Sequence, residues 1–229
     1  MTGKLENIST CVFDAYGTLF DVNAAAAHCA DDLGDKWQPL ADVWRTKQLQ
    51  YTWLRSLMKR HVDFWQVTTD ALDYALDTVG VDDAALRQKL LDLYMQLDAY
   101  GEVADVLTAL KDAGLKTAIL SNGSPDMLAS AVSNAGLDKL LDANLSVEDV
   151  GIYKPDPSVY QLVLDHFSIA APEVSFQSSN AWDAAGAATF GFRVVWVNRF
   201  GQAPERLPDQ PDFEVKTLAE LPAIVGVSG

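Results

Sequence analysis

The sequence holds few cysteines and no long apolar segment. Its 229 residues include only Cys11 and Cys29, whose spacing fits no zinc motif and which are too few for a disulfide framework. No apolar run approaches the ~20 residues of a membrane span, and the first ten residues lack the apolar core of a signal peptide. We therefore expect free thiols and a cytoplasmic protein.

Positive charge is also scarce. The chain has 17 Lys and Arg residues against 32 Asp and Glu residues, which gives a formal net charge of -15. Such a chain repels phosphate backbones and anionic lipids, so we expect no nucleic acid and no membrane among its partners. A small anionic substrate would be repelled at long range as well, so any site for one needs cations close by.

Several motifs of catalysis and nucleotide binding are missing. The three histidines, His28, His61 and His166, form no HExxH motif and no recognisable catalytic triad. The sequence contains neither a Walker loop nor a GxGxxG motif. A histidine metal site and a P-loop nucleotide site therefore have no support.

The chain does show a change of hydrophobic rhythm along its length. Residues 8–13 form a short apolar run, as expected for a strand buried on both faces. Residues 22–99 show helical spacing, whereas helices and strands alternate after Gly101, which predicts a parallel sheet flanked by helices. The expected strands cover residues 8–13, 116–120, 143–147, 174–177 and 192–197, and the expected helices after Gly101 cover residues 103–113, 125–136, 157–167, 181–188 and 218–225.

Polar side chains follow three of the expected strands. Asp14 follows the first strand, Ser121 follows the second, and Ser178 begins a polar triplet after a later one. Ligands of parallel sheets bind beyond the carboxyl ends of the strands, so we expect these side chains to converge. Asp14 could attack an electrophilic carbon or phosphorus, but in isolation a turn-forming or helix-capping aspartate explains it better. Lys154 could keep such a carboxylate charged, or be a solvated loop lysine.

Four ordered motifs give these residues a more specific meaning. They read FDAYGTL, ILSN, YKPD and SSNAWD, and the segment WRTKQLQYTWLRSLM lies between the first two. Together they resemble the haloacid dehalogenase superfamily, and within it the (S)-2-haloacid dehalogenases. The resemblance implies an α/β fold: a Rossmann-like core of residues 1–17 and 98–229, with a helical cap of residues 18–97 inserted after the first strand.

Most members of this superfamily are magnesium-dependent phosphatases, and that alternative can be tested on the residues. Phosphatases of this kind carry a second aspartate where this chain has Tyr16, and acidic metal ligands where it has Ser178, Ser179 and Asn180, so that only Asp183 is kept. Magnesium prefers carboxylate oxygens, and a phosphoester without metal or acid has little help in expelling its alkoxide. We therefore expect no metal and no organic cofactor. A small-molecule phosphatase and a catalytically silent binding protein stay as the alternatives.

The resemblance implies a reaction in two steps. Asp14 attacks the halogen-bearing carbon of a short (S)-2-haloalkanoic acid, which gives an ester with inverted configuration. Water then attacks the carbonyl carbon of this ester, and an (R)-2-hydroxy acid leaves. Arg45 and Asn122 would stabilise the departing halide, and Ser121 would receive the substrate carboxylate, helped by nearby backbone N–H groups.

The resemblance also assigns the remaining site residues. Lys154 would orient Asp14 and balance its charge, while Asn180 and Asp183 would position and activate the hydrolytic water. The residues expected to hydrogen-bond around the nucleophile are Thr18 and Ser178, and those expected to form an apolar substrate pocket are Tyr16, Leu49, Phe64 and Trp182. Tyr160 matches a family position near Lys154 and is expected to be a supporting residue of the substrate site. Homodimers are common in this family, so the resemblance leaves a homodimer open. The halogen preferred, the chain length of the substrate and the physiological substrate do not follow from these residues.

Overall fold

A six-stranded parallel sheet forms the centre of the molecule. The structure is a computed structural model that describes residues 3–227. The strands run in the order β3-β2-β1-β4-β5-β6, and every neighbouring pair is parallel. Their bounds are β1 Thr10–Phe13, β2 Lys116–Ser121, β3 Ala143–Ser146, β4 Val174–Ser178, β5 Arg193–Val197 and β6 Phe213–Val215.

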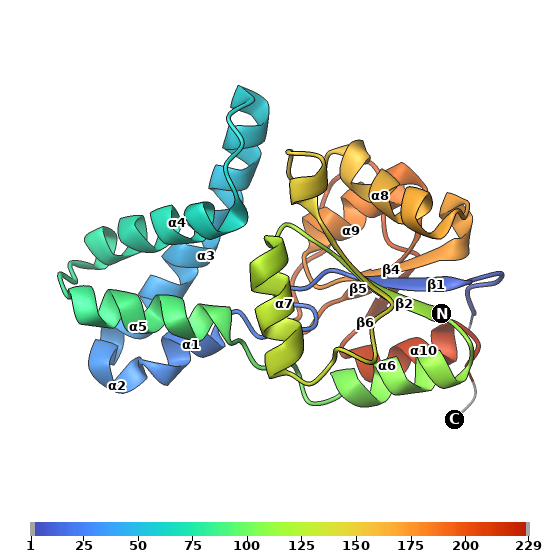
Figure 1. Ribbon diagram of the computed structural model, residues 1–229, viewed down its shortest axis with the longest axis horizontal. Coiled ribbons are helices and arrows are strands. Elements are labelled where there is room, and N and C mark those ends of the chain that lie inside the picture. The colour runs from blue at the N-terminus through green and yellow to red at the C-terminus, as the bar shows by residue number, and fades with distance from the viewer. Residues whose placement is uncertain (1–2, 228–229) are drawn as a thin grey trace.

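Helices cover both faces of this sheet. Figure 1 shows α6 and α10 against one face, and α8 and α9 against the other, while α7 packs beside β3. Pro125 and Pro157 each occupy the first turn of a helix, where a missing N–H costs nothing. The helices of this layer are α6 Val103–Asp112, α7 Pro125–Asn134, α8 Pro157–Phe167, α9 Ala181–Phe190 and α10 Leu221–Ile224, with short 3₁₀ turns η2 Val147–Asp149, η3 Ala171–Glu173 and η4 Leu218–Glu220.

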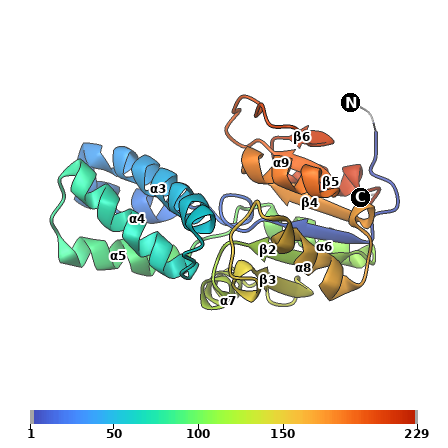
Figure 2. The same cartoon turned by 90° about the horizontal axis from the view of Figure 1, so that it is seen from above.

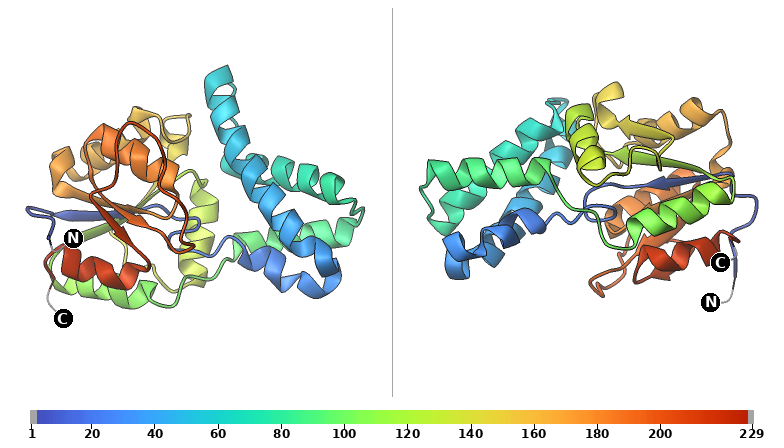
Figure 3. Two further views of the ribbon diagram at one scale, coloured as in Figure 1. Left: turned by 180° about the vertical axis from the view of Figure 1, so that it is seen from behind. Right: turned by 60° about the horizontal axis from the view of Figure 1, so that its bottom comes forward.

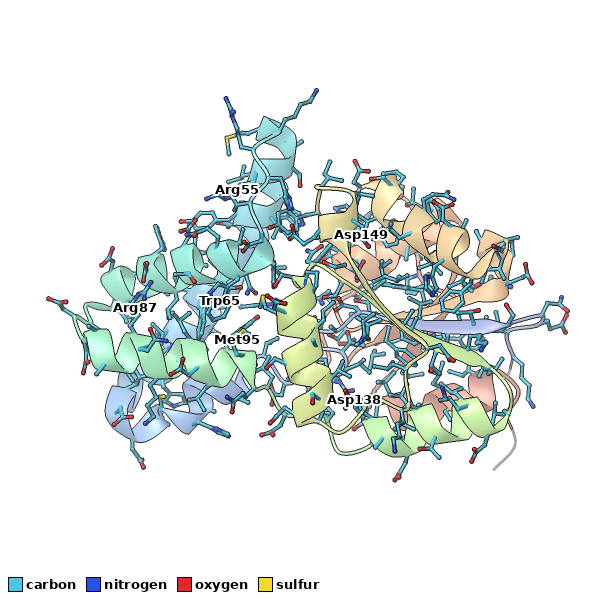
Figure 4. All side chains as sticks on the ribbon, viewed as in Figure 1. Arg55, Trp65, Arg87, Met95, Asp138 and Asp149 are labelled. Carbon is cyan, nitrogen blue, oxygen red and sulfur yellow. The ribbon has the colours of Figure 1, made fainter. Side chains whose placement is uncertain are left out.

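Five helices between β1 and α6 form a second body beside the sheet, as Figures 1 and 2 show. Asp63 and Asp83 cap two of them, because each side chain accepts hydrogen bonds from backbone N–H groups of the first turn. Arg87, which Figure 4 labels on the helical body, joins these two helices, because its Nη2 donates to Asp73 Oδ2 at 3.0 Å. The helices are α1 Ala24–His28, α2 Ala30–Leu33, α3 Trp37–Met58, α4 Phe64–Val79 and α5 Ala84–Met95, with a 3₁₀ turn η1 Gly34–Lys36. No helix formed by residues 3–227 is both long and apolar enough to cross a membrane.

Two chain segments connect the helical body to the sheet, and they run side by side (Figure 3). Phe20 and Ala99 form an antiparallel bridge, and the Tyr100 N–H donates to the Leu19 carbonyl at 2.9 Å. The Asp21 N–H donates to the carbonyl of Asp98 at 3.0 Å. The cap therefore leaves and rejoins the core through one paired strip of backbone.

The structure confirms the predicted α/β fold with a parallel sheet and an all-helical insertion. All five expected strands are present, with ends that differ by one or two residues. The prediction missed β6, which pairs with β5 at the edge of the sheet. Only three residues form this strand, and Glu214 stands exposed in its middle, so the segment lacks the apolar run that marked the other strands.

Candidate active site

The carboxyl ends of three neighbouring strands bring the predicted polar side chains together. β1 lies between β2 and β4, at the point where the strand order reverses. Asp14 directly follows β1, Ser121 is the last residue of β2, and Ser178 is the last residue of β4. Doubly wound sheets open a ligand crevice at this place. The expected convergence is therefore present in the fold.

Asp14 is buried and accepts hydrogen bonds at both of its carboxylate oxygens. Oδ2 accepts from the Thr18 hydroxyl at 3.1 Å and from the Asn180 amide at 2.8 Å. Oδ1 lies 3.2 Å from the Lys154 ammonium nitrogen. Three donors from three separate segments of chain fix the direction of this carboxylate. Each of the three was expected from the sequence to act at the site.

Lys154 is fully buried between two carboxylates. Its Nζ lies 2.9 Å from Asp183 Oδ2 and 3.2 Å from Asp14 Oδ1. Burial disfavours the ammonium, but the two carboxylates outweigh this effect, so the pKa of Lys154 is raised. The lysine is therefore a fixed cation that neutralises part of the buried negative charge.

Asp183 has the properties of a base. It is fully buried, and burial raises its pKa, with repulsion from Asp14 in the same direction and attraction by Lys154 opposing. Tyr160 donates its hydroxyl proton to Asp183 Oδ1 at 2.8 Å, and burial raises the pKa of Tyr160 well above its usual range. A carboxylate whose pKa is moved toward neutrality accepts a proton more readily than an ordinary aspartate.

Arg45 reaches the site from α3 of the helical body. Its Nη2 donates to Asn180 Oδ1 at 3.0 Å and to the Tyr16 carbonyl at 3.4 Å, and its Nη1 donates to Gln48 Oε1 at 2.8 Å. Asn180 thus links the cap arginine to Asp14. A second cation beside Lys154 meets the requirement that the strongly negative net charge sets for an anionic substrate.

Three further predicted polar residues shape the loops around Asp14. The Ser121 hydroxyl accepts from the Gly123 N–H at 3.0 Å, and Asn122 Oδ1 accepts from the Lys154 N–H at 3.1 Å. The Ser178 hydroxyl accepts from the Asn180 N–H at 3.2 Å, and no hydrogen bond joins it to Asp14 within residues 3–227. Asn122 therefore holds the segment that carries Lys154, a contact that the sequence did not suggest.

Apolar side chains close the other side of the site. The Tyr16 ring lies with its centroid 5.7 Å from that of Phe64 and 5.8 Å from that of Tyr94. Leu49 and Trp182 line a cleft of about 830 Å³ that Arg45 and Asn180 also border. The Tyr16 and Phe64 rings suit contact with a short alkyl chain, whereas many polar side chains border the cleft, and neither ring is part of its lining. A second cavity of about 370 Å³ behind Tyr160 has no charged side chain in its lining.

The sequence reasoning gave no role to two residues that contact the site. The Ser179 hydroxyl oxygen lies 3.2 Å from Thr18 Oγ1, and the Ser179 N–H donates to Thr18 Oγ1 at 2.8 Å. It appeared only as a missing metal ligand. Gln48 contacts Arg45, and only its position three residues after Arg45 on a helix could have suggested this.

Comparison with known protein families identifies the family of this chain. The family described as haloacid dehalogenase-like hydrolase matches residues 8–191. The chain belongs to the haloacid dehalogenase-like hydrolases, among the (S)-2-haloacid dehalogenases. Its place among the (S)-2-haloacid dehalogenases rests on relatives that match over nearly their full length, several of which are named (S)-2-haloacid dehalogenase.

Three of these dehalogenases illustrate the relationship. (S)-2-haloacid dehalogenase 1 of Pseudomonas sp. (strain CBS-3) is 46% identical over 96% of this chain and 98% of its own. (S)-2-haloacid dehalogenase 4A of Burkholderia cepacia is 44% identical over 95% of this chain and 94% of its own. The structure of L-2-haloacid dehalogenase from Xanthobacter autotrophicus with chloropropionic acid covalently bound is 39% identical, with a TM-score of 0.89 over 96% of this chain and 100% of that one.

Membership of the (S)-2-haloacid dehalogenases makes the chain a hydrolase of the haloacid dehalogenase superfamily. It does not by itself assign a role to any residue. The described residues contain no group of three or more His, Cys, Asp or Glu side chains arranged to hold a metal ion.

Proposed function

We propose that the chain hydrolyses short (S)-2-haloalkanoic acids to (R)-2-hydroxy acids and halide through an ester on Asp14. The observation that carries this proposal is the orientation of the Asp14 carboxylate, which donors from Thr18, Lys154 and Asn180 hold at the head of the crevice. A bare carboxylate held in this way is a nucleophile, and halide leaves carbon without needing a proton. Family membership supports the same reaction.

In the first step, one Asp14 oxygen attacks C2 of the substrate from the side opposite the halogen. The new O–C2 bond forms as the carbon–halogen bond breaks, and the halide leaves with the electron pair. Negative charge grows on the halogen during this step, so a cation fixed beside it lowers the barrier. Arg45 is the cap cation that contacts the site, and the configuration at C2 is inverted.

In the second step, water attacks the carbonyl carbon of the Asp14 ester. Asp183 accepts one proton of this water, and Asn180 helps to position it. The tetrahedral intermediate then breaks its bond to the oxygen of C2, this oxygen takes the proton back from Asp183 so that the 2-hydroxy acid leaves, and the regenerated Asp14 carboxyl gives up its own proton to solvent. Asp183 and Asp14 both contact the Lys154 ammonium, so the two carboxylates lie near one another and a base stands close to the ester. C2 keeps its inverted configuration because no bond to C2 changes in this step.

The same contacts suggest how the substrate is held. Ser121 and the N–H groups near it would bind the substrate carboxylate, and Tyr16, Leu49, Phe64 and Trp182 would enclose the alkyl chain. Asn122 would assist Arg45 at the halide. These assignments keep the carboxylate, the alkyl chain and the halogen on three different surfaces, which is what recognition of one enantiomer requires.

The phosphatase alternative is weaker on the same contacts. Phosphatases of the superfamily need a second acid where Tyr16 stands, and burial raises the pKa of this phenol well above its usual range. A buried phenol with such a pKa is a poor acid for a leaving alkoxide. The Lys154 ammonium also lies between the two carboxylates, where it already supplies positive charge.

Halide release from the two enantiomers of 2-chloropropionate, with and without a chelator, tests the function. We expect release from the (S) enantiomer alone and no effect of the chelator, while Asp14→Asn releases none. Phosphate release that depends on magnesium would favour the phosphatase alternative, and halide release that the chelator stops would contradict a reaction without metal.

A single turnover in ¹⁸O-water tests the covalent route. Water enters through the ester carbonyl, so mass spectrometry of the peptide that contains Asp14 should detect one heavy oxygen there. The first 2-hydroxy acid released should carry none. Heavy oxygen in that first product would show that water attacks C2 directly.

The assembly and location of the chain stay predictions. Leu54, Leu57 and Met58 are exposed near the end of α3, where a second copy of the chain could cover them if the homodimer forms. Light scattering during size-exclusion chromatography would give the number of chains. The cytoplasmic location expected from the sequence would be checked by cell fractionation.

A further inference from the structure

Gln48 is a buried polar residue in the middle of α3. It is 1% exposed, and its side chain points away from solvent into the region where α3, α4 and α5 meet. An amide in such a place costs free energy unless all its hydrogen-bonding groups find partners. In Gln48 every one of them does.

The direction of each hydrogen bond around Gln48 is fixed by Thr68 on α4. The Thr68 hydroxyl gives its single proton to the Phe64 carbonyl at 2.7 Å, so it can only accept from Gln48. Gln48 Nε2 therefore faces Thr68, at 2.8 Å, and its second proton goes to the Tyr94 hydroxyl at 2.9 Å. The same hydroxyl also lies 3.2 Å from Gln48 Oε1, a longer contact than that of Oε1 with Arg45. This leaves Gln48 Oε1 as an acceptor on the side of the active site.

The acceptor that remains is the one that binds Arg45. Gln48 Oε1 lies 2.8 Å from Arg45 Nη1, while Nη2 of the same guanidinium contacts Asn180 Oδ1 and the Tyr16 carbonyl in the core. A planar guanidinium held at one nitrogen has its other nitrogen aimed by geometry. The Gln48 amide thus connects Thr68 on α4 and Tyr94 on α5 to the Arg45 guanidinium.

We propose that Gln48 is the positioning residue for Arg45: it holds the guanidinium at the angle that meets the departing halogen. Thr68 and Tyr94 act through Gln48, because they fix which end of its amide faces the arginine. This proposal deepens the proposed function and rests on it. Gln48 itself touches neither the substrate nor Asp14.

The leaving group gives a readout that general loosening of the cap would not change. Chloride is a poorer leaving group than bromide, so its displacement depends more on a well-placed cation. Loss of the hydrogen bond between Gln48 and Arg45 should therefore slow release of chloride more than release of bromide. A variant that merely loosens the cap should slow both alike.

Gln48→Met tests the proposal because methionine has about the same shape and neither donates nor accepts strongly. We expect single-turnover displacement of chloride from (S)-2-chloropropionate to fall on the order of tenfold, a part of what loss of a catalytic donor costs. The fall for (S)-2-bromopropionate should be smaller. In an Arg45→Ala background, Gln48→Met should change either rate by less than about twofold, because coupled residues are not additive.

Two companion variants separate positioning from folding. Gln48→Met removes both contacts of the Tyr94 hydroxyl with the amide, so Gln48→Met combined with Tyr94→Phe should recover stability while chloride release stays slow. Thr52→Val is the matched control, since Thr52 is a buried polar residue of α3 that bonds only the Leu49 carbonyl. We expect it to leave the ratio of chloride to bromide rates unchanged.

A crystal structure of Gln48→Met decides the positioning claim without any activity. The Arg45 guanidinium should leave Asn180 and take more than one orientation. If it keeps its contacts with Asn180 and Tyr16, or if the effects of the Arg45 and Gln48 substitutions are additive, the proposal is wrong. Absence of halide release from the wild-type chain would instead overturn the proposed function, and the crystal structure would still report on Gln48.

Discussion

Asp14, Asp183 and Lys154 place two negative charges and one positive charge in a buried space. Both carboxylates lie within 3.2 Å of the same ammonium nitrogen, so neither has a cation of its own. Burial and the repulsion by Asp14 raise the pKa of Asp183. The folded chain therefore favours the protonated form of Asp183 more than the unfolded chain does. Keeping Asp183 ionised at neutral pH lowers the free energy of unfolding.

Asp183→Asn should reveal this cost through its dependence on pH. A group whose pKa is raised on folding contributes stability below its unfolded pKa of about 4 and loses it as the pH rises through the folded pKa. The wild-type chain has this loss and the variant does not. The free energy of unfolding should thus shift in favour of the variant as the pH rises from 4, when urea unfolding is measured at several pH values. Release of the 2-hydroxy acid should fall at least about a hundredfold, because the base of the second step is gone.

A constant difference in unfolding free energy between the two proteins at all pH values would contradict this account. Thr52→Val serves as a control, since it changes a buried polar residue without changing any charge. Its difference from the wild type should not vary with pH.

Site residues that directly follow strands could be predicted from the sequence. Residues whose contacts depend on how helices pack could not. Asp14, Ser121 and Ser178 were placed correctly because parallel strands all end at one edge of the sheet. Gln48 was not given a role, because its partners Thr68 and Tyr94 come from two other helices. No local pattern specifies how three helices of a cap turn their faces toward one another.

At the scale of elements, α9 connects the site to the sheet. It begins directly after Asn180, carries Asp183 in its first turn and packs on β4 and β5. Gly186 lies one turn beyond Asp183, where a Cβ atom would come within 2.7 Å of both Pro155 Cβ and the Tyr160 hydroxyl. The helix therefore approaches the segment that holds Lys154 as closely as a glycine allows.

Gly186→Ala should push α9 away from Lys154 and Tyr160. We expect a loss of stability of about 1–3 kcal/mol from overpacking, reduced by the better helix propensity of alanine, and a slower second step because Asp183 moves with the helix. Thermal unfolding and single-turnover release of the 2-hydroxy acid measure the two effects.

Gly101→Ala is the control for this substitution. A Cβ atom at Gly101 meets nothing within 4 Å, and its backbone lies outside the left-handed region. It should alter neither stability nor rate by much. If Gly186→Ala behaved like this control, the close approach of α9 would have no bearing on the site.

Prediction of the elements succeeded in proportion to their apolar content. β1, β2 and β5 are almost wholly buried and carry continuous apolar runs, whereas β4, which reads VSFQS, alternates apolar with polar residues although it is buried throughout. β6 was missed because an edge strand of three residues with an exposed glutamate has no such run. Its place is set by pairing with β5, which is a property of the folded sheet.

At the scale of the whole molecule, the two bodies are joined by the paired segments around Leu19 and Ala99. Arg199, which follows β5, contacts both segments: its Nη2 donates to the Thr18 carbonyl at 2.9 Å, and its Nη1 lies 2.7 Å from Glu102. Its guanidinium also lies 3.8 Å from the centre of the Tyr100 ring. We infer that residues 18–97 act as one cap, and that Arg199 fixes the base on which this cap is held.

Arg199→Met should loosen this base without unfolding the chain, because the methionine side chain can still pack on Tyr100. Amide hydrogen exchange at Asp21 and Tyr100, whose N–H groups bond across the two segments, should become about tenfold faster, since exchange follows the free energy of local opening. The substrate should also bind more weakly, because the cap brings Arg45 to the core only while its base is fixed.

Arg193→Met gives the comparison that isolates the base of the cap. Arg193 also belongs to the β5 region and pairs with Asp212 at 2.7 Å, but it touches neither connecting segment. Its replacement should leave exchange at Asp21 and Tyr100 unchanged. If Arg199→Met did the same, the paired backbone strip alone would hold the cap, because the hydrogen bonds between Leu19 and Tyr100 and between Asp21 and Asp98 would be sufficient to keep Arg45 at the site.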